Sequence, residues 1–264
     1  MKRSSGVRLC ATAAAGALSL VLVTGCGGDG SKNAGEAPGK GAGEPAAQAL
    51  GATELTKRII AEGEVPGYKV GPVTGGLAAK GGARADDARC DPLLHALTGI
   101  APGTPAAKTS RMATEVKKRP TGGATSPDGM AGGGFEDAIK RSMDLDVTVV
   151  TLASYDGDGA ERALKSVSDA VTACADGFSG EQDGEKGTFT KVTEERSAGT
   201  GDASVAFTAT DDAGEDGAMP LHAQVVRHGN TLATYTTVNI GAGMAEKPYT
   251  VPAPVVRAQA AKLK

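Results

Sequence analysis

Aromatic residues are scarce in this chain of 264 residues. Tryptophan is absent, and four tyrosines and four phenylalanines make up an aromatic share of 3%. A core without large rings has to be built from Val, Leu, Ala and Ile, which bury less apolar area per side chain. The length allows one or two domains. We therefore expect a modestly packed fold that draws stability from other sources as well.

An excess of basic residues is also missing. The first 25 residues carry three basic side chains and no acidic one, so 25 basic and 31 acidic residues remain and give a net charge of −6. Nucleic-acid binding requires clustered Lys and Arg that displace counterions from phosphates. The charge balance therefore argues against a nucleic-acid partner.

Motifs of catalysis and metal binding are absent too. We find no G-x-S-x-G elbow, no H-E-x-x-H pair, and no Gly-Lys-Ser/Thr after the glycines at 132–134. The histidines are His95, His222 and His228. The last two share strand parity but would lie about 20 Å apart, with no third ligand nearby. We interpret them as solvent-facing strand positions and expect no metal, no cofactor and no catalytic residue.

Two acidic segments have some of the residues of a cation site. Residues 156–161 read D-G-D-G-A-E, but Ala160 stands where a calcium loop needs an acidic ligand, and Glu161 stands where it needs glycine. A helix start fits better, with Asp158 and Glu161 capping each other's amides. The acidic run at 211–216 is either a weak cation site or a solvated hairpin tip.

The N-terminal segment predicts export and a lipid anchor. Residues 1–25 combine a basic start with an apolar run that is short for a lasting membrane span. Their end, Val23-Thr-Gly followed by Cys26, resembles the bacterial lipobox, in which the cysteine is acylated. We expect a lipoprotein signal peptide, and Cys26 bound to the lipid membrane at the outer face of the cytoplasmic membrane. The alternative is an ordinary secreted protein cleaved nearby.

A tether and a disulfide are expected after the signal peptide. Residues 26–52 are rich in Gly, Ala and Pro with almost nothing to bury, so they predict a disordered tether with a reach of about 30 Å. Cys10 leaves with the signal peptide and Cys26 takes the lipid. The remaining pair, Cys90 and Cys174, should therefore bond to each other outside the cytoplasm.

Strands and helices alternate in the folded part, residues 53–264. A β-branched run at 147–155 predicts a strand, and it leads into a helix whose apolar residues recur at spacings of three and four up to Phe178. Residues 108–119 favour a strand, 135–143 are open between a helical turn and a strand, and 75–88 and 179–187 look like loops. Further strands are expected at 68–73, 188–194, 203–210, 220–227 and 231–240, and further helices at 53–61, 91–100 and 252–264. The last four strands are closely spaced, so they should form an antiparallel meander. The prediction is an α+β fold, an antiparallel sheet with helices packed on it and one disulfide.

Three tyrosines are the polar residues of interest. Tyr68, Tyr155 and Tyr235 lie in or at the end of expected strands, and a ring with a hydroxyl suits the wall of a ligand cleft. The alternative is that each packs in the core with its hydroxyl at the surface. We keep all three as candidate ligand-binding residues.

The order of elements resembles the PknH-like extracellular sensor domain, relatives of which occur as free-standing actinobacterial lipoproteins. The likeness spans 53–264. It is carried by an opening helix with Leu55, the turn at 65–68, Cys90 before a Leu-rich helix, the Val-rich strand, the helix with Cys174, the meander and the closing segment at 252–259. The resemblance implies an antiparallel sheet with helices, a cleft for a small ligand and disulfide stapling. This chain departs from the family in having no kinase domain, no Trp and cysteines for one mature bridge.

Together these features predict a membrane-anchored extracytoplasmic module that binds or senses a small-molecule or envelope ligand without catalysis. The alternatives are an envelope structural protein that docks a partner and, less favoured, a cell-wall hydrolase.

Overall fold

The computed structural model describes residues 48–74, 81–117, 144–212, 214, 217–239, 241 and 248–264. These residues lie in one compact unit, 43–264. The unit contains both core clusters and the disulfide, as a domain that folds on its own does. The expected signal peptide, Cys26, most of the tether and the ambiguous segment 135–143 lie outside the described residues. Residues 48–52, expected to be tether, are described and contact the domain.

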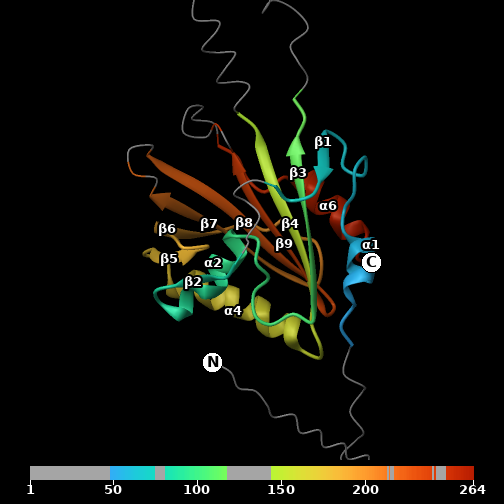
Figure 1. Cartoon of the computed structure of the whole chain (residues 1–264), viewed down its shortest axis with the longest axis horizontal. Helices are drawn as coiled ribbons and strands as arrows, with labels where there is room; N and C mark the ends of the chain where they lie inside the picture. Colours follow the sequence, from blue (N-terminus) through green and yellow to red (C-terminus); the bar gives the residue numbers. More distant parts are fainter. Residues whose placement is uncertain are drawn as a thin grey trace, which may run out of the picture. The chain divides into compact units, whose positions relative to one another are not determined.

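One antiparallel sheet of nine strands, in the order β1-β3-β4-β9-β8-β7-β6-β5-β2, forms the centre of the described structure (Figure 1). The expected α+β class and the meander are confirmed, because β5 to β9 pair consecutively. The strands are β1 (Tyr68–Gly71), β2 (Ala83–Ala85), β3 (Ala107–Glu115), β4 (Asp146–Ser154), β5 (Phe178–Gln182), β6 (Glu185–Glu195), β7 (Ala203–Asp212), β8 (Ala218–His228) and β9 (Thr231–Asn239).

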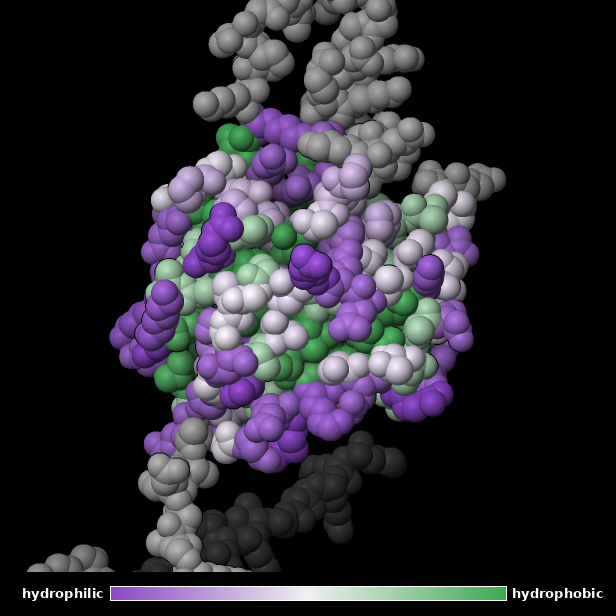
Figure 2. Space-filling model, turned by 180° about the vertical axis from the view of Figure 1, so that it is seen from behind, coloured by the Kyte–Doolittle hydropathy of each residue, from purple (hydrophilic) through white to green (hydrophobic). Residues whose placement is uncertain are grey.

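Helices cover both faces of this sheet. We call the face packed by α2 (Asp91–Leu97) and α4 (Gly159–Ala173) the front face, and the face packed by α1 (Ala52–Arg58) and α6 (Ala253–Ala261) the back face. Successive strand residues point to opposite faces. Leu232 of β9 accordingly joins the front cluster, whereas its neighbour Ala233 joins the back cluster. Figure 2 shows the back face, where hydrophobic residues gather in the middle and hydrophilic residues surround them.

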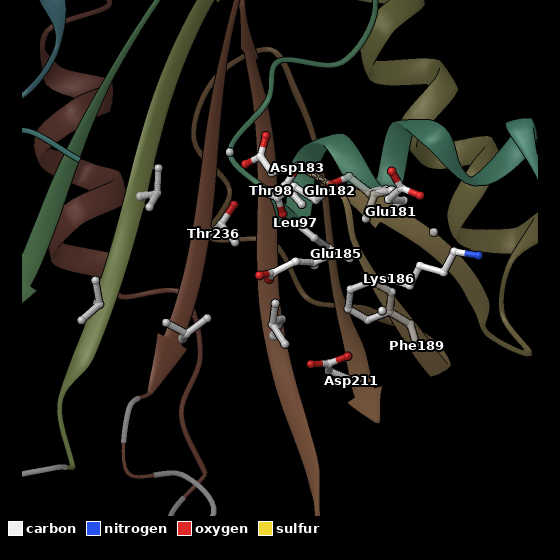
Figure 3. Close-up of a pocket in the computed structure, with 18 residues that line it drawn as sticks. Leu97, Thr98, Glu181, Gln182, Asp183, Glu185, Lys186, Phe189, Asp211 and Thr236 are labelled. Carbon is white, nitrogen blue, oxygen red and sulfur yellow. Dashed lines mark hydrogen bonds between the residues drawn. The ribbon is translucent and has the colours of Figure 1, made fainter. Parts of the chain in front are cut away.

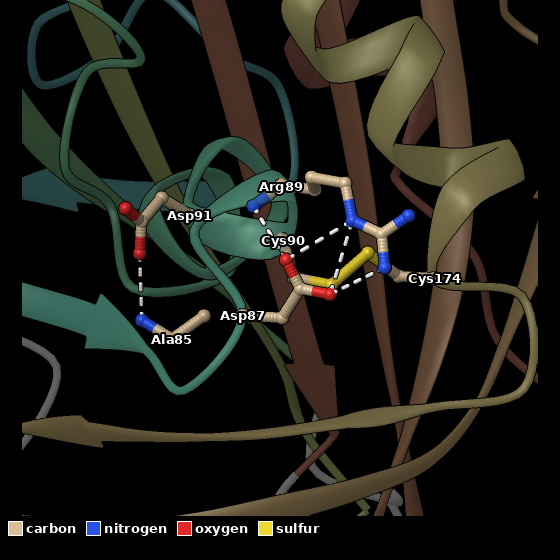
Figure 4. The surroundings of a disulfide bond; sticks show 6 residues. All are labelled: Ala85, Asp87, Arg89, Cys90, Asp91 and Cys174. Carbon is tan, nitrogen blue, oxygen red and sulfur yellow. Dashed lines mark hydrogen bonds and ion pairs between the residues drawn. A yellow bond between two sulfur atoms is a disulfide. The ribbon is translucent and has the colours of Figure 1, made fainter.

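The predicted disulfide is present and ties the two front helices together. Cys90 ends the 3₁₀ turn η2 (Ala88–Cys90) before α2, and Cys174 follows the last residue of α4, with 6.1 Å between their Cα atoms (Figure 4). Both cysteines are buried. Asp91 accepts the amide proton of Ala85 at 2.7 Å, which fastens β2 to the start of α2.

Two local expectations need correction. Asp158 does not cap Glu161, because its backbone (φ −89°, ψ 11°) is not extended as a capping residue requires, and its carboxylate pairs with Arg162 instead. Phe178 begins β5 and does not continue α4. Gly177, at φ 97°, turns the chain so close to β6 that a Cβ there would lie 2.3 Å from the carbonyl oxygen of Phe189.

Two segments expected as loops form strands, and one ambiguous segment is resolved. β2 and β5 lie in the loop-like segments 75–88 and 179–187. Residues 108–119, for which a strand was favoured, contribute most of β3.

Candidate functional site

A cavity of about 550 Å³ lies on the front face beyond the C-terminal end of α2 (Figure 3). It exists because α2 is short. Gly99 leaves the helical path at φ 71°, and the Thr98 hydroxyl donates to the Leu94 carbonyl at 2.7 Å, closing the last turn. The strands beneath continue past this point. Part of the sheet is thus left without a helix from the described residues above it.

The floor of the cavity is apolar and comes from three adjacent strands. Its side chains are Val147 and Val149 from β4, Val238 from β9 and Leu221 from β8. All four side chains point to the front face, as do the residues of the front cluster on the same strands. The floor is therefore a continuation of the core surface.

The hairpin of β5 and β6 forms one wall. Its turn is Asp183-Gly184, with both residues at positive φ, as the tight primed hairpin turns require. Phe178 faces Phe189 across the hairpin, with 4.9 Å between the ring centroids. Strand alternation then puts Glu185 on the cavity side with Phe189, and Lys186 on the opposite side. Figure 3 shows the Lys186 ammonium pointing away from the carboxylates of Glu185 and Asp211.

Two carboxylates on the cavity side form no ion pair with the residues that the structure describes. Asp211 of β7 lies opposite Phe189 in the sheet register. Burial raises the pKa of the half-buried Asp211 carboxyl, and the negative charge of Asp212 raises it further. Neither Asp211 nor Glu185 forms a salt bridge within the described residues. The cavity thus joins an apolar floor to a wall of negative charge.

A second hollow of about 270 Å³ contains Tyr68, one of the three candidate tyrosines. Two of its carboxylates, those of Asp144 and Asp146, are engaged by neighbouring residues. Lys117 Nζ lies 2.6 Å from an Asp144 oxygen, and Asn239 Nδ2 donates to Asp144 at 2.9 Å and to Asp146 at 2.7 Å. Burial raises the pKa of the Tyr68 hydroxyl, and the nearby carboxylates add to this.

The structure does not bring the three candidate tyrosines together. Tyr155 is 2% exposed in the front cluster, and its hydroxyl donates to the Pro102 carbonyl at 2.6 Å. Tyr235 is 0% exposed in the back cluster. Burial raises the pKa of both hydroxyls. Both residues lie on or just after central strands that helices cover, so their rings pack in the core. A ligand role for Tyr68 stays a prediction.

His222 was expected to face solvent, and this was wrong. It is 7% exposed on the back face, where its Nδ1 lies 3.0 Å from a Glu195 carboxylate oxygen and 3.1 Å from the Thr208 hydroxyl. The ring of Tyr249 packs edge-on against it at 4.6 Å. β8 is an inner strand, which is why an alternating position there is covered. Within the described residues no group of three or more His, Cys, Asp or Glu side chains is placed to hold a metal.

Sequence reasoning missed the residues of the 550 Å³ cavity. Glu185 lies in a segment expected to be a loop, and Asp211 was assigned to a solvated tip or weak cation site. One signal was available. The dipeptide Asp183-Gly184 is a strong hairpin turn sequence, and Phe178 and Phe189 flank it symmetrically.

A scan against protein-family models and a search of the curated proteins both return no match. Among solved structures, the fold is similar to the extracellular domain of PknH from Mycobacterium tuberculosis, with 9% identity, a TM-score of 0.47, and 82% of this chain and 95% of that chain covered. It is also similar to an uncharacterized protein, an Rv0999 ortholog, from Mycobacterium smegmatis, with 14% identity, a TM-score of 0.32, and coverage of 80% and 94%. Likeness at this level assigns neither family membership nor function.

Helices long and apolar enough to span a membrane are not found among the residues that the structure describes.

Proposed function

We propose that this chain is a non-catalytic extracytoplasmic module that binds or senses a ligand, held at the outer face of the cytoplasmic membrane by acylated Cys26. The 550 Å³ cavity on the front face is the observation that carries the proposal. Its volume lies in the range of small-molecule sites, about 300 to 1,000 Å³, and its floor is preformed by strands. The Cys90–Cys174 disulfide supports the address, since such bonds persist in oxidising compartments.

The entry point of the chain supports an anchored binding module. The Ala49 amide donates to the Asp156 carboxylate at 3.0 Å, and the Leu50 amide donates to the Ser154 hydroxyl at 2.9 Å. Both acceptors lie at or just beyond the C-terminal end of β4, whereas Val147 of the cavity floor lies near its N-terminal end. That separation is roughly 23 Å along the strand. A tether that joins at residue 48 therefore leaves the cavity clear of the attachment point.

The hydroxyls of the cavity lining are not placed as nucleophiles. They belong to Thr98 and Thr236, and each donates to a backbone carbonyl, of Leu94 and Ala96 respectively. A nucleophile needs a neighbouring base that takes its proton. Hydroxyls already committed to backbone carbonyls serve as structural contacts.

The proposal is tested by soaking the purified unit, residues 43–264, in cell-envelope extract. We then measure its thermal shift and identify retained compounds by mass spectrometry. Gly187→Trp is the blocking variant. Gly187 faces the cavity side of the hairpin, and a Cβ at this position meets no atom within 4 Å, so the indole has room to enter without backbone strain.

Thr193→Trp is the matched control, because Thr193 is an exposed position on the same strand with opposite facing. We expect a retained compound and a thermal shift in the wild type and in the control, and neither in Gly187→Trp. If Gly187→Trp retains the compound as well as the wild type does, the compound binds outside this cavity. No shift and no retained compound would count against ligand binding.

A further inference from the structure

The chemical class of the ligand can be inferred from the charges around the front-face cavity. Val149, Val238 and Leu221 come from adjacent strands that lie about 4.8 Å apart. The floor is thus about 10 Å wide between β4 and β8, enough for one ring or a short alkyl chain. An apolar group on this floor would lose contact with water without needing hydrogen bonds.

The wall above the floor is negatively charged, in contrast to the apolar floor. Glu185 and Asp211 are on the same side of the sheet as Phe189, and both line the cavity. The Asp211 carboxylate is partly removed from water and needs a positive partner to offset the cost, whereas the exposed Glu185 carboxylate adds negative charge beside it.

No positive partner reaches the cavity from the residues that the structure describes. Lys186 is the one basic residue in the described lining. Its register with Glu181 across the hairpin puts both side chains on the outer side, and Figure 3 shows the ammonium pointing outward. The second hollow differs, because there Lys117 pairs with Asp144 and Asn239 donates to both aspartates. Within the described residues, the carboxylates of Glu185 and Asp211 are therefore left to pair with a ligand.

We infer that the cavity takes a small amphipathic cation, an apolar body of one ring or a short chain that carries an ammonium or guanidinium group. The apolar body lies on the floor of Val149, Val238 and Leu221, and the cationic group reaches Glu185 or Asp211. This inference rests on the proposed function, that the cavity binds a ligand, and adds the class of that ligand.

The test uses three probes that share one apolar body and differ in charge: 4-phenylbutylamine, 4-phenylbutanol and 4-phenylbutanoate. Their affinities for residues 43–264 are measured by calorimetry at neutral pH, with folding checked by circular dichroism. A hydrogen bond between the ammonium group and a carboxylate contributes enough binding free energy for the amine to bind about tenfold more tightly than the alcohol. We expect the amine to bind about tenfold more tightly than the alcohol, and the carboxylate to bind most weakly. Added salt should weaken the amine and leave the alcohol unchanged.

Two variants identify the groups responsible. Glu185→Gln and Asp211→Asn keep side-chain size and remove charge, and the double variant should bind amine and alcohol within about twofold of each other. Glu161→Gln makes the same change in the exposed first turn of α4, away from the cavity lining, and serves as the matched control. It should keep the full preference for the amine.

The outcomes separate the ligand class from the proposed function. Equal or tighter binding of the carboxylate, or an amine preference that survives in the double variant, would overturn the inference and leave the binding function in place. Binding of none of the three probes, when envelope extract does yield a retained compound, would overturn the class alone. Failure of both the probes and the extract would overturn the function as well.

Discussion

Two regions of the same front face behave differently although their strands are continuous. In the covered region, under α2 and α4, Leu232, Val225 and Ala153 are fully buried. In the open region, beyond Leu97, Leu221 on β8 and Val238 on β9 are only half-buried, whereas the floor residues of β4 stay buried. Alternating strands produce a core where a helix lies over them and a binding floor where the helix stops. The length of α2, seven residues, therefore sets the position of the candidate site.

The largest expected effect is the loss of stability when the disulfide of the covered region is removed. Removal of the disulfide in the double variant Cys90→Ala, Cys174→Ala frees a loop with a sequence separation of 84 residues. The chain-entropy model gives a loss of about 4.5 kcal/mol in the free energy of unfolding. Urea denaturation of residues 43–264 measures it. A loss below about 1 kcal/mol would mean that packing alone holds α2 against α4.

A matched pair of leucines compares the two regions directly. Leu232→Ala empties a fully buried position on β9 and should lower the free energy of unfolding by about 3 kcal/mol. Leu221→Ala removes the same atoms from the cavity floor on the neighbouring strand, where they already face open space. We expect a loss of about 1 kcal/mol there. Equal losses in denaturant titrations would show that the cavity floor is as tightly packed as the core.

A pair of glycines sharpens the comparison across the hairpin. Gly180 and Gly187 are direct cross-strand partners. A Cβ at Gly180 would lie 2.8 Å from Leu94 Cδ2 and 2.9 Å from the Arg84 carbonyl oxygen, whereas one at Gly187 meets nothing within 4 Å. Gly180→Ala should therefore cost about 2 kcal/mol through overpacking, and Gly187→Ala should stay within about 0.5 kcal/mol. Thermal melts of both variants decide this, and similar melting temperatures would refute the asymmetry.

The same hairpin shows which parts of the fold sequence patterns predict and which parts they do not. The β-branched run at 147–155 and the meander were predictable, because their alternation is strong and local. β5 was not, since Gly180 and the charged residues near the turn have low strand propensity. Tertiary contact holds it in place, through the Phe178–Phe189 ring pair and the tight turn at Gly177. The cavity was out of reach for a related reason, because it depends on where α2 ends above strands from elsewhere in the chain.

The smallest expected effects are two opposite responses to pH at the two ends of the sheet. His228, at the end of β8, has a pKa lowered by burial, and its Nε2 has no hydrogen-bond partner among the described residues. The neutral ring is favoured in the folded state. The neutral His228 ring therefore contributes stability above pH 6.5, the pKa of the unfolded state. This contribution is lost as the pH falls from 6.5 through the lower pKa of the folded state.

Asp211, in the open region, has a pKa raised first by burial and then by Asp212, so its ionised form costs stability. That cost is full above the raised folded pKa and is relieved as the pH falls toward the unfolded value of about 3.9. Urea titrations from pH 4 to 8 should therefore show His228→Gln flattening the profile near pH 6, and Asp211→Asn raising stability at neutral pH. A neutral or destabilising Asp211→Asn would mean that a cation already compensates the carboxylate in the unliganded protein, and that the covered and open regions are more alike in charge than their surfaces show.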